Sequence, residues 1–215
     1  MTWDWSFAWG ILPELLEGLA VTVQITLIGS AIAMVLGLVI AVVRHSKLPV
    51  ISALVGGLVQ FIRGTPLLVQ AFFLFYVFPS YGLTLPALTT GIIAIGIHYS
   101  AYAAEAYRAG IESVPRGQWE AATALSLSPR RRWTGVVLPQ AIRAVIPSLG
   151  NYVIAMFKDS AILAAITVVE VLNTAQAIGS DSFRYLEPLT LAGLLYLLVS
   201  YPAAKLIRRL EHRLA

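Results

Sequence analysis

The sequence contains no cysteine and few charged residues, and these two shortages exclude several classes of protein. Without a thiol, a chain of 215 residues forms neither disulfide bonds nor thiolate metal sites. Charged residues make up 12% of the chain and hydrophobic residues 58%, which is more apolar surface than a soluble fold of this length can bury. The composition therefore predicts that lipid surrounds much of the chain.

Motifs of catalytic sites are also missing. The sequence has no G-x-S-x-G and no H-E-x-x-H, and His45, His98 and His212 are too widely separated to indicate a metal site. It has no G-x-x-x-x-G-K-[ST] loop that could bind nucleotide phosphates. We therefore expect no catalytic residue, metal site or cofactor in this chain. The net charge of +4 is attributed to membrane topology and not to nucleic-acid binding.

Long runs without charge predict membrane-spanning helices. About 26 residues between Glu17 and Arg44, and about 41 between Arg63 and Glu105, carry no charge, whereas one helical span needs about 20 residues. Lipid offers no partner to backbone groups, so these runs are expected to be helical. We predict one all-α membrane domain over residues 1–215. Its spans are placed at about 16–43, 50–78, 88–111, 139–166 and 188–207, with a weaker helix at 168–178.

The distribution of basic residues predicts the orientation. Cytoplasmic loops of membrane proteins carry an excess of Lys and Arg. The first loop, the third loop and the C-terminus hold such residues, namely Arg44, Lys47, Arg116, Arg130, Arg131, Arg132, Lys205, Arg208, Arg209 and Arg213. The second connection, 79–87, has no charge, and the N-terminus combines acidic residues with tryptophans. The N-terminus is therefore expected outside and the C-terminus in the cytoplasm.

Small residues recur at every fourth position of the first predicted span, at Gly29, Ala33, Gly37 and Ala41. Such a stripe lets a second helix approach closely. Two interpretations stay open at this stage: the stripe packs against another helix of the same chain, or it packs against a second subunit.

Arg63 lies near the middle of the second predicted span, where a charge costs about 2.5–3.5 kcal/mol on insertion scales. It is therefore expected to face protein or water. Pro66 removes a backbone hydrogen bond and predicts a bend near Gly64, which would expose carbonyl groups to a cavity. The alternative is a buried ion pair that serves only packing.

Polar residues of the fourth predicted span could complete a polar pathway. A zwitterionic solute needs a cation for its carboxylate and an acceptor for its ammonium group. The predicted pathway residues are Arg63, Thr65, Gln70, Asn151, Lys158, Asp159 and Ser160. The alternative is that Lys158 and Asp159 merely neutralise each other. Glu105 and Arg108, three residues apart, are interpreted as a structural pair.

The segment 117–127 is too short and too polar to span a membrane and predicts a cytoplasmic helix. Its physical chemistry alone leaves open a connector lying on lipid headgroups or a helix that meets a partner. Glu120, Ala121 and Ala122, followed by Leu138 and Pro139, resemble the EAA signature of permease subunits of bacterial ATP-binding-cassette (ABC) importers. Ser126 departs from the signature, which usually has glycine there, so the turn after the helix could be shaped differently.

A second stretch, Arg63-Gly-Thr-Pro-Leu-Leu-Val-Gln70, is similar to the polar amino acid branch of these permeases, and the resemblance covers nearly the whole chain. It implies the MetI-like fold of type I importers in a bacterial inner membrane. It implies a coupling function for Glu120, Ala121, Ala122, Ser126, Leu138 and Pro139. The implied partners are a cytoplasmic ATPase dimer that binds ATP and Mg²⁺, a second permease subunit (the same chain or a sibling), and an extracytoplasmic solute-binding protein.

Three other functions stay open on the sequence. Permeases for compatible solutes, such as ectoine-type osmolytes, are similar to this branch. A secondary transporter or channel would need no ATPase, but such proteins normally show paired repeats, and none is evident here. A membrane scaffold that moves no solute would explain the basic internal segment but would leave the intramembrane Arg63 without a purpose.

Overall fold

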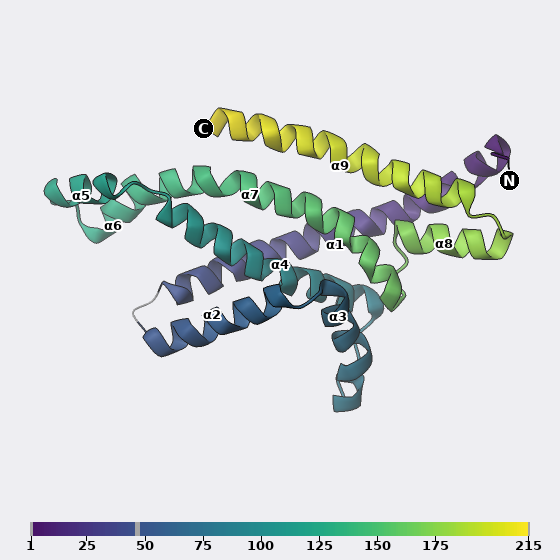
Figure 1. Cartoon of the computed structure of the whole chain (residues 1–215), viewed down its shortest axis with the longest axis horizontal. Coiled ribbons are helices and arrows are strands. Elements are labelled where there is room, and N and C mark those ends of the chain that lie inside the picture. The colour runs from purple at the N-terminus through teal and green to yellow at the C-terminus, as the bar shows by residue number, and fades with distance from the viewer. Residues whose placement is uncertain (1, 46–47, 215) are drawn as a thin grey trace.

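Helices form almost the whole structure, because lipid-facing backbone must satisfy its hydrogen bonds within each segment (Figure 1). The computed structural model describes residues 2–45 and 48–214, and no strand occurs in these ranges. The elements are α1 (Trp5–Arg44), α2 (Pro49–Gly64), α3 (Leu67–Phe72), η1 (Phe73–Val77), η2 (Phe78–Tyr81), α4 (Ala87–Glu112), α5 (Arg116–Ala124), α6 (Pro129–Arg132), η3 (Trp133–Val137), α7 (Leu138–Asp159), η4 (Ser160–Ile166), α8 (Val171–Ser182) and α9 (Leu186–Leu214).

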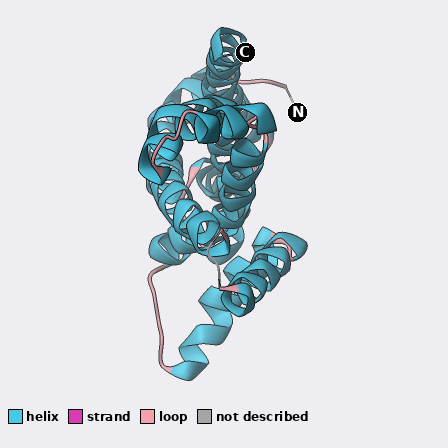
Figure 2. Ribbon diagram, turned by 90° about the vertical axis from the view of Figure 1, so that its left-hand side faces the viewer, coloured by secondary structure: helices cyan, strands magenta, loops and turns pink. Residues whose placement is uncertain are grey.

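Within the described ranges, four helices are long and apolar enough to cross a membrane, namely α1, α4, the continuous stretch Pro129–Ile166 and α9. The second predicted span, 50–78, is not one straight helix. It is a pair, Pro49–Gly64 and Leu67–Tyr81, bent by 103° at the break. The predicted bend near Gly64 is confirmed, and its size makes this region a broken span or a re-entrant segment. Figure 2 shows the pair projecting from the main bundle.

Several predicted boundaries are wrong. α1 begins at Trp5 and not at residue 16, because the Asp4 carboxylate caps it by accepting from the Ser6 and Phe7 N–H groups at 2.9 and 3.2 Å. At 1.5 Å per residue its 40 residues span about 60 Å, well beyond a hydrocarbon core of about 30 Å. The fourth span begins at Pro129, ten residues before the predicted start, and the weak helix 168–178 is α8.

The small-residue stripe of α1 packs against α4 of the same chain. A Cβ atom added at Gly37 would lie 2.7 Å from the Ala103 Cβ and 2.9 Å from the Ser100 carbonyl oxygen. At Gly29 it would lie 2.7 Å from an Ile95 methyl group. The first of the two interpretations is therefore the one that the structure shows, because only small residues let the two helices approach so closely.

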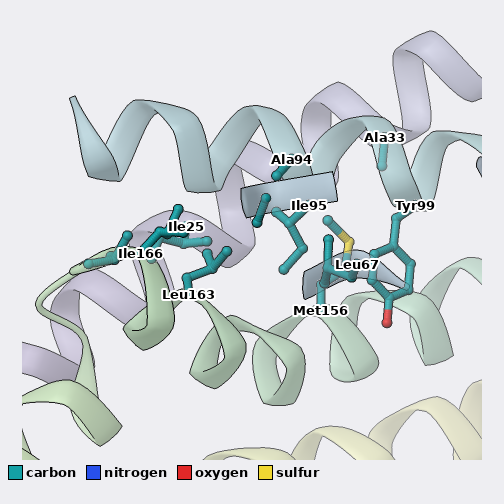
Figure 3. Close-up of a cluster of buried hydrophobic side chains, with 11 residues drawn as sticks. Ile25, Ala33, Leu67, Ala94, Ile95, Tyr99, Met156, Leu163 and Ile166 are labelled. Carbon is teal, nitrogen blue, oxygen red and sulfur yellow. The ribbon is translucent and has the colours of Figure 1, made fainter. Parts of the chain in front are cut away.

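One hydrophobic cluster joins residues of α1, α3, α4, α7 and η4 (Figure 3). Ile25 of α1, Ile95 of α4 and Leu163 of η4 are completely buried in it, and Met156 of α7 is nearly so. Leu67, the first residue of α3, belongs to the same cluster. The broken pair is thus anchored to the bundle just beyond its corner, whereas of the residues of α2 only Val59 is buried.

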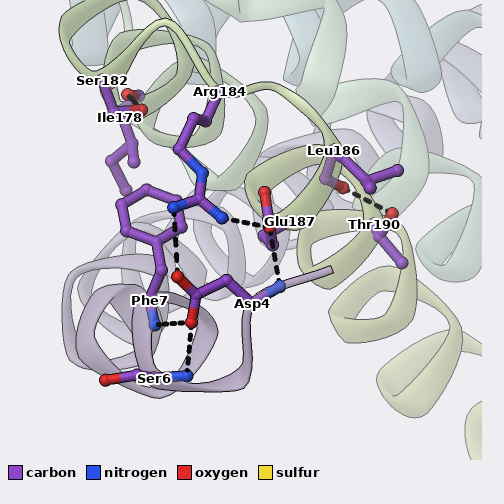
Figure 4. A network of polar contacts seen from close by, with 9 residues as sticks. All are labelled: Asp4, Ser6, Phe7, Ile178, Ser182, Arg184, Leu186, Glu187 and Thr190. Carbon is purple, nitrogen blue, oxygen red and sulfur yellow. Dashed lines mark hydrogen bonds and ion pairs between the residues drawn. The ribbon is translucent and has the colours of Figure 1, made fainter. Parts of the chain in front are cut away.

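A polar network fastens the N-terminal end of the bundle (Figure 4). Arg184, between α8 and α9, donates to Asp4 at 3.2 Å and to Glu187 at 2.6 Å, and its guanidinium lies 4.4 Å from the centre of the Phe7 ring. The Asp4 N–H donates to Glu187 at 3.0 Å. The start of α1 is therefore tied to the turn that leads into α9. The α5 and α6 helices lie at the opposite end (Figure 1), as the predicted orientation requires.

Candidate functional site

The predicted coupling segment is a short helix held on its own platform. α5 covers Arg116–Ala124, so the predicted range 117–127 extends three residues too far at its C-terminal end. Trp119 packs edge-on against Trp133 of η3, with ring centres 5.2 Å apart, and Ala122 is only 2% exposed. Glu120 and Ala121 are exposed. A partner could therefore touch Glu120 and Ala121, whereas the Ala122 methyl group packs inside this chain.

The turn after α5 has the backbone shape that glycine favours, although the residue there is Ser126. Its φ angle is 52°, in the left-handed region. The Ser126 N–H donates to Thr123 O at 2.9 Å and the Leu127 N–H to Ala122 O at 3.1 Å, which closes the turn. The substitution leaves the turn intact at a steric cost of about 1 kcal/mol. Leu138 and Pro139 open α7, apart from this turn.

Arg63, in the last turn of α2, faces an open hollow of about 530 Å³. Its guanidinium carbon lies 5.1 Å from the centre of the Tyr102 ring of α4. No carboxylate within residues 2–45 and 48–214 lies close enough to pair with it, and the side chain is exposed. The buried ion pair considered from the sequence is therefore not formed. Other residues at the hollow include Glu105, Arg108, Ser113, Ser148 and Tyr152.

Tyrosines link this hollow to the fourth span, a feature that the sequence analysis missed. The Tyr102 ring centre lies 5.9 Å from that of Tyr152 and 5.8 Å from that of Tyr99. The Tyr99 hydroxyl donates to the Asp159 carboxylate at 2.6 Å. The signal in the sequence is the pair of tyrosines three residues apart in the charge-free run that precedes Glu105. Arg63 and Asp159 therefore sit at two ends of one aromatic path.

The remaining polar residues of the fourth span do not converge on one point. Lys158 is exposed and forms no ion pair with Asp159 or any other described residue, so the alternative, in which these two residues neutralise each other, is not what the structure shows. Ser160 is buried and donates to the Phe157 carbonyl at 2.8 Å, within its own helix. Asn151 is exposed on α7. That these three contact a solute stays a prediction.

Thr65 and Gln70 lie at the corner of the broken span. The Gln70 amide nitrogen donates to the Thr65 hydroxyl at 2.7 Å and to the Ile62 carbonyl at 2.8 Å. Both residues border an apolar cavity of about 290 Å³ that is distinct from the hollow beside Arg63. Thr65 and Gln70 therefore border a different cavity from the one that Arg63 faces.

The Glu105 and Arg108 pair is confirmed as part of a larger cluster. Arg108 binds one Glu105 oxygen at 2.7 Å and also pairs with Glu112, while Arg44 of α1 binds the other Glu105 oxygen. From the sequence Arg44 is predicted only as a cytoplasmic charge, because nothing local indicates a contact with Glu105, which lies 61 residues away. The cluster joins the ends of α1 and α4 beside the hollow.

Among the described residues no group of His, Asp and Glu could hold a metal ion.

The sequence matches the family model described as "Binding-protein-dependent transport system inner membrane component" over residues 11–215. Because the match covers nearly all of the chain, the protein belongs to this family, and it is an integral membrane protein. The all-helical fold is the MetI-like fold of type I importer permeases, as predicted.

Individual relatives align with this chain over nine-tenths or more of their length. A protein of Sinorhizobium fredii described as a probable amino-acid ABC transporter permease is 48% identical, and the alignment covers 96% of this chain and 92% of the relative. An L-cystine transport system permease of Bacillus subtilis is 36% identical over 94% of this chain and 90% of the relative. The crystal structure of an amino acid ABC transporter with histidines has a TM-score of 0.95 at 35% identity, covering 99% of this chain and all of that one.

Proposed function

We propose that this chain is the permease subunit of an ABC importer that takes a polar amino acid or a similar zwitterion into the cell. The observation that carries the proposal is the extent of the likeness. The amino-acid permeases described above align with nearly the whole chain, including both the α5 region and the Arg63 segment. Compatible-solute import and a scaffold without transport have no such support.

The proposed assembly supplies what this chain lacks. A cytoplasmic ATPase dimer binds ATP and Mg²⁺, a second permease subunit completes the pathway, and a solute-binding protein delivers the solute from outside. ATP hydrolysis is assigned to the partner because the sequence of this chain has no phosphate-binding loop. The family description places such proteins in the inner membrane, and we propose the same location here.

Two regions of the chain would carry the function. Arg63 presents an unpaired cation to an open hollow, where it would attract the carboxylate of a solute. The exposed Glu120 and Ala121 would contact the ATPase: Glu120, the fifth of the nine residues of α5, offers a carboxylate to a basic group of the partner, and alanine adds little bulk. Because the α5 platform includes η3, which continues into α7, movement of α5 would reach the fourth span directly.

Charge reversal at Glu120 tests the coupling. In proteoliposomes containing the complete importer, Glu120→Lys should reduce ATP-driven uptake at least tenfold, because it places a cation where the ATPase is proposed to bind. The matched control is Glu211→Lys, at an exposed position near the end of α9. Insertion and purification yield of both variants should equal those of the parental chain. Undiminished uptake by Glu120→Lys would refute the coupling function of α5.

A further inference from the structure

The corner of the broken span has an unusual hydrogen-bond problem. In a continuous helix the Ile62 carbonyl would accept from the N–H group of the residue four positions later, but that residue is Pro66, which has no N–H. Thr65, directly before the proline, is extended with φ −110° and ψ 140°. The last carbonyl groups of α2 therefore lie at the corner, in a segment that belongs to the membrane-spanning region. A carbonyl group without a hydrogen-bond donor is costly there.

Without the Pro66 N–H, the Ile62 carbonyl is left with two long contacts, from the Thr65 N–H at 3.4 Å and the Thr65 hydroxyl at 3.2 Å, and the side chain of Gln70 adds the shortest one. Its amide nitrogen lies 2.8 Å from the Ile62 carbonyl oxygen, 3.2 Å from the Thr65 carbonyl oxygen and 2.7 Å from the Thr65 hydroxyl. Gln70 stands four residues after Pro66, so the first turn of α3 brings its side chain back over the end of α2. A side chain of α3 thus caps the helix on the other side of the break.

The other end of the same amide contacts α4. Because carbonyl oxygens only accept, the Gln70 nitrogen must face them, and the Gln70 oxygen must face the His98 Nδ1 at 3.2 Å. His98 therefore donates from Nδ1. His98 is buried, and one turn further along α4 is Tyr102, the ring beneath the Arg63 guanidinium. One carboxamide thus joins the end of α2, the start of α3 and the helix against which Arg63 rests.

We infer that Gln70 is a positioning residue: it fixes the corner of the broken span and thereby holds Arg63 over Tyr102 in the hollow. Gln70 acts through Arg63 and does not itself contact the solute. This differs from the sequence-based prediction, in which Gln70 lines the pathway. The solute-uptake part of the inference rests on the proposed function, but the positioning does not.

A distance measurement tests the positioning without any solute or partner. The chain has no cysteine, so spin labels can be attached at Leu54→Cys on α2 and Ser80→Cys on η2, both exposed positions on either side of the corner. The full chain in lipid nanodiscs, diluted with unlabelled chain, is measured by pulsed electron paramagnetic resonance. Gln70→Met keeps the length and apolar packing of the side chain but cannot donate. We expect a broadened or shifted distance distribution for Gln70→Met and no change for Gln176→Ala, an exposed glutamine on α8.

Uptake by the complete importer supplies the second readout. Gln70→Met should raise KM for the solute or lower kcat by about tenfold, since small displacements of a positioned group have large effects. In the Arg63→Gln background the same substitution should add less than twofold, because its effect passes through Arg63. A general loss of stability would instead lower uptake by the same factor in both backgrounds.

The two readouts separate the possible failures. An unchanged distance distribution in Gln70→Met overturns the positioning inference, whatever the uptake. Equal factors in the two backgrounds overturn the link to Arg63 and indicate a purely structural residue. Absence of uptake by the parental importer would refute the proposed function, while an altered distance distribution would still support the positioning of the corner by Gln70.

Discussion

The first span and the second span both contain a proline, yet only the second is broken. α1 continues through Pro13 for 40 residues, whereas the chain turns by 103° at Pro66. Pro147 and Pro202 also lie inside continuous helices, α7 and α9. A proline in a membrane helix therefore does not break it without further features.

The surroundings of each proline explain the difference. Around Pro13, Ile11 and Leu15 of α1 are buried in a cluster with residues of α8 and α9, so a corner there would lose this packing. α2 buries only Val59 and is free to diverge from α4. At Pro66 the preceding Thr65 is extended, and Gln70 donates to the Ile62 carbonyl at 2.8 Å, alongside the longer contacts from the Thr65 N–H and hydroxyl. A break is stable where polar side chains satisfy both of its ends.

The largest effect is expected from a substitution in the contact between α1, the unbroken first span, and α4. Gly37→Leu forces a side chain into the Ala103 methyl group and the backbone of α4, and overpacking of this kind costs about 1–3 kcal/mol or more. We expect loss of most of the monodisperse protein in size-exclusion chromatography. Gly57→Leu, on α2, is the matched control, because a Cβ there would meet no atom within 4 Å. Equal amounts of monodisperse protein from the two variants would contradict the claim that α1 is tightly packed at Gly37 and α2 is not packed at Gly57.

A smaller effect is expected from removing the proline itself. Pro66→Ala restores an N–H donor for Ile62 and removes a constraint of about 3 kcal/mol against a continuous helix. The distance between labels at Leu54→Cys and Ser80→Cys should therefore become longer or acquire a longer component. Pro13→Ala should leave this distance unchanged. If Pro66→Ala also leaves it unchanged, the contacts of Gln70 and the packing of α3 alone maintain the corner.

The smallest effect concerns the outer end of the first span. The Phe7 N–H and the Arg184 guanidinium both bond to the Asp4 carboxylate and lower its pKa below the ordinary 3.8. A lowered folded-state pKa means that this contact stabilises the fold above pH 3.8 and is lost as the pH falls through the lower value. The protection of the amides near Phe7 against hydrogen exchange, corrected for the intrinsic pH dependence of exchange, should fall in that acidic range, and Asp4→Ala should show the lower protection already at neutral pH. No dependence on Asp4 would show that the N-terminal cap does not hold this end.

Much of the fold was predictable because hydrophobic length and charge are local signals. The third span is an example: the predicted range 88–111 and the observed Ala87–Glu112 differ by one residue at each end. The early start of α1 was not predicted, because Asp4 was interpreted as a topological charge and not as a helix cap. The size of the corner at Pro66 was not predicted, and the contact there between Gln70 and His98 joins residues 28 positions apart, which no local signal indicates.

The candidate site was predictable only in part. The exposure of Arg63 was predictable from the cost of burying a charge. The partner of Asp159 was not, because Asp159 accepts a hydrogen bond from Tyr99, 60 positions away, and does not pair with its neighbour Lys158. The shape of the turn at Ser126 could not be predicted, since a left-handed serine and a different turn were equally compatible with the sequence.

The central claim is that this chain forms the pathway of an ATP-driven importer. The most direct measurement is uptake of radiolabelled polar amino acids into proteoliposomes that contain the chain, with the ATPase and the solute-binding protein each present or omitted. The account predicts accumulation against a gradient only when ATP and both partners are present. Solute flux that persists without the ATPase, or no flux with any polar amino acid in the complete system, would contradict it.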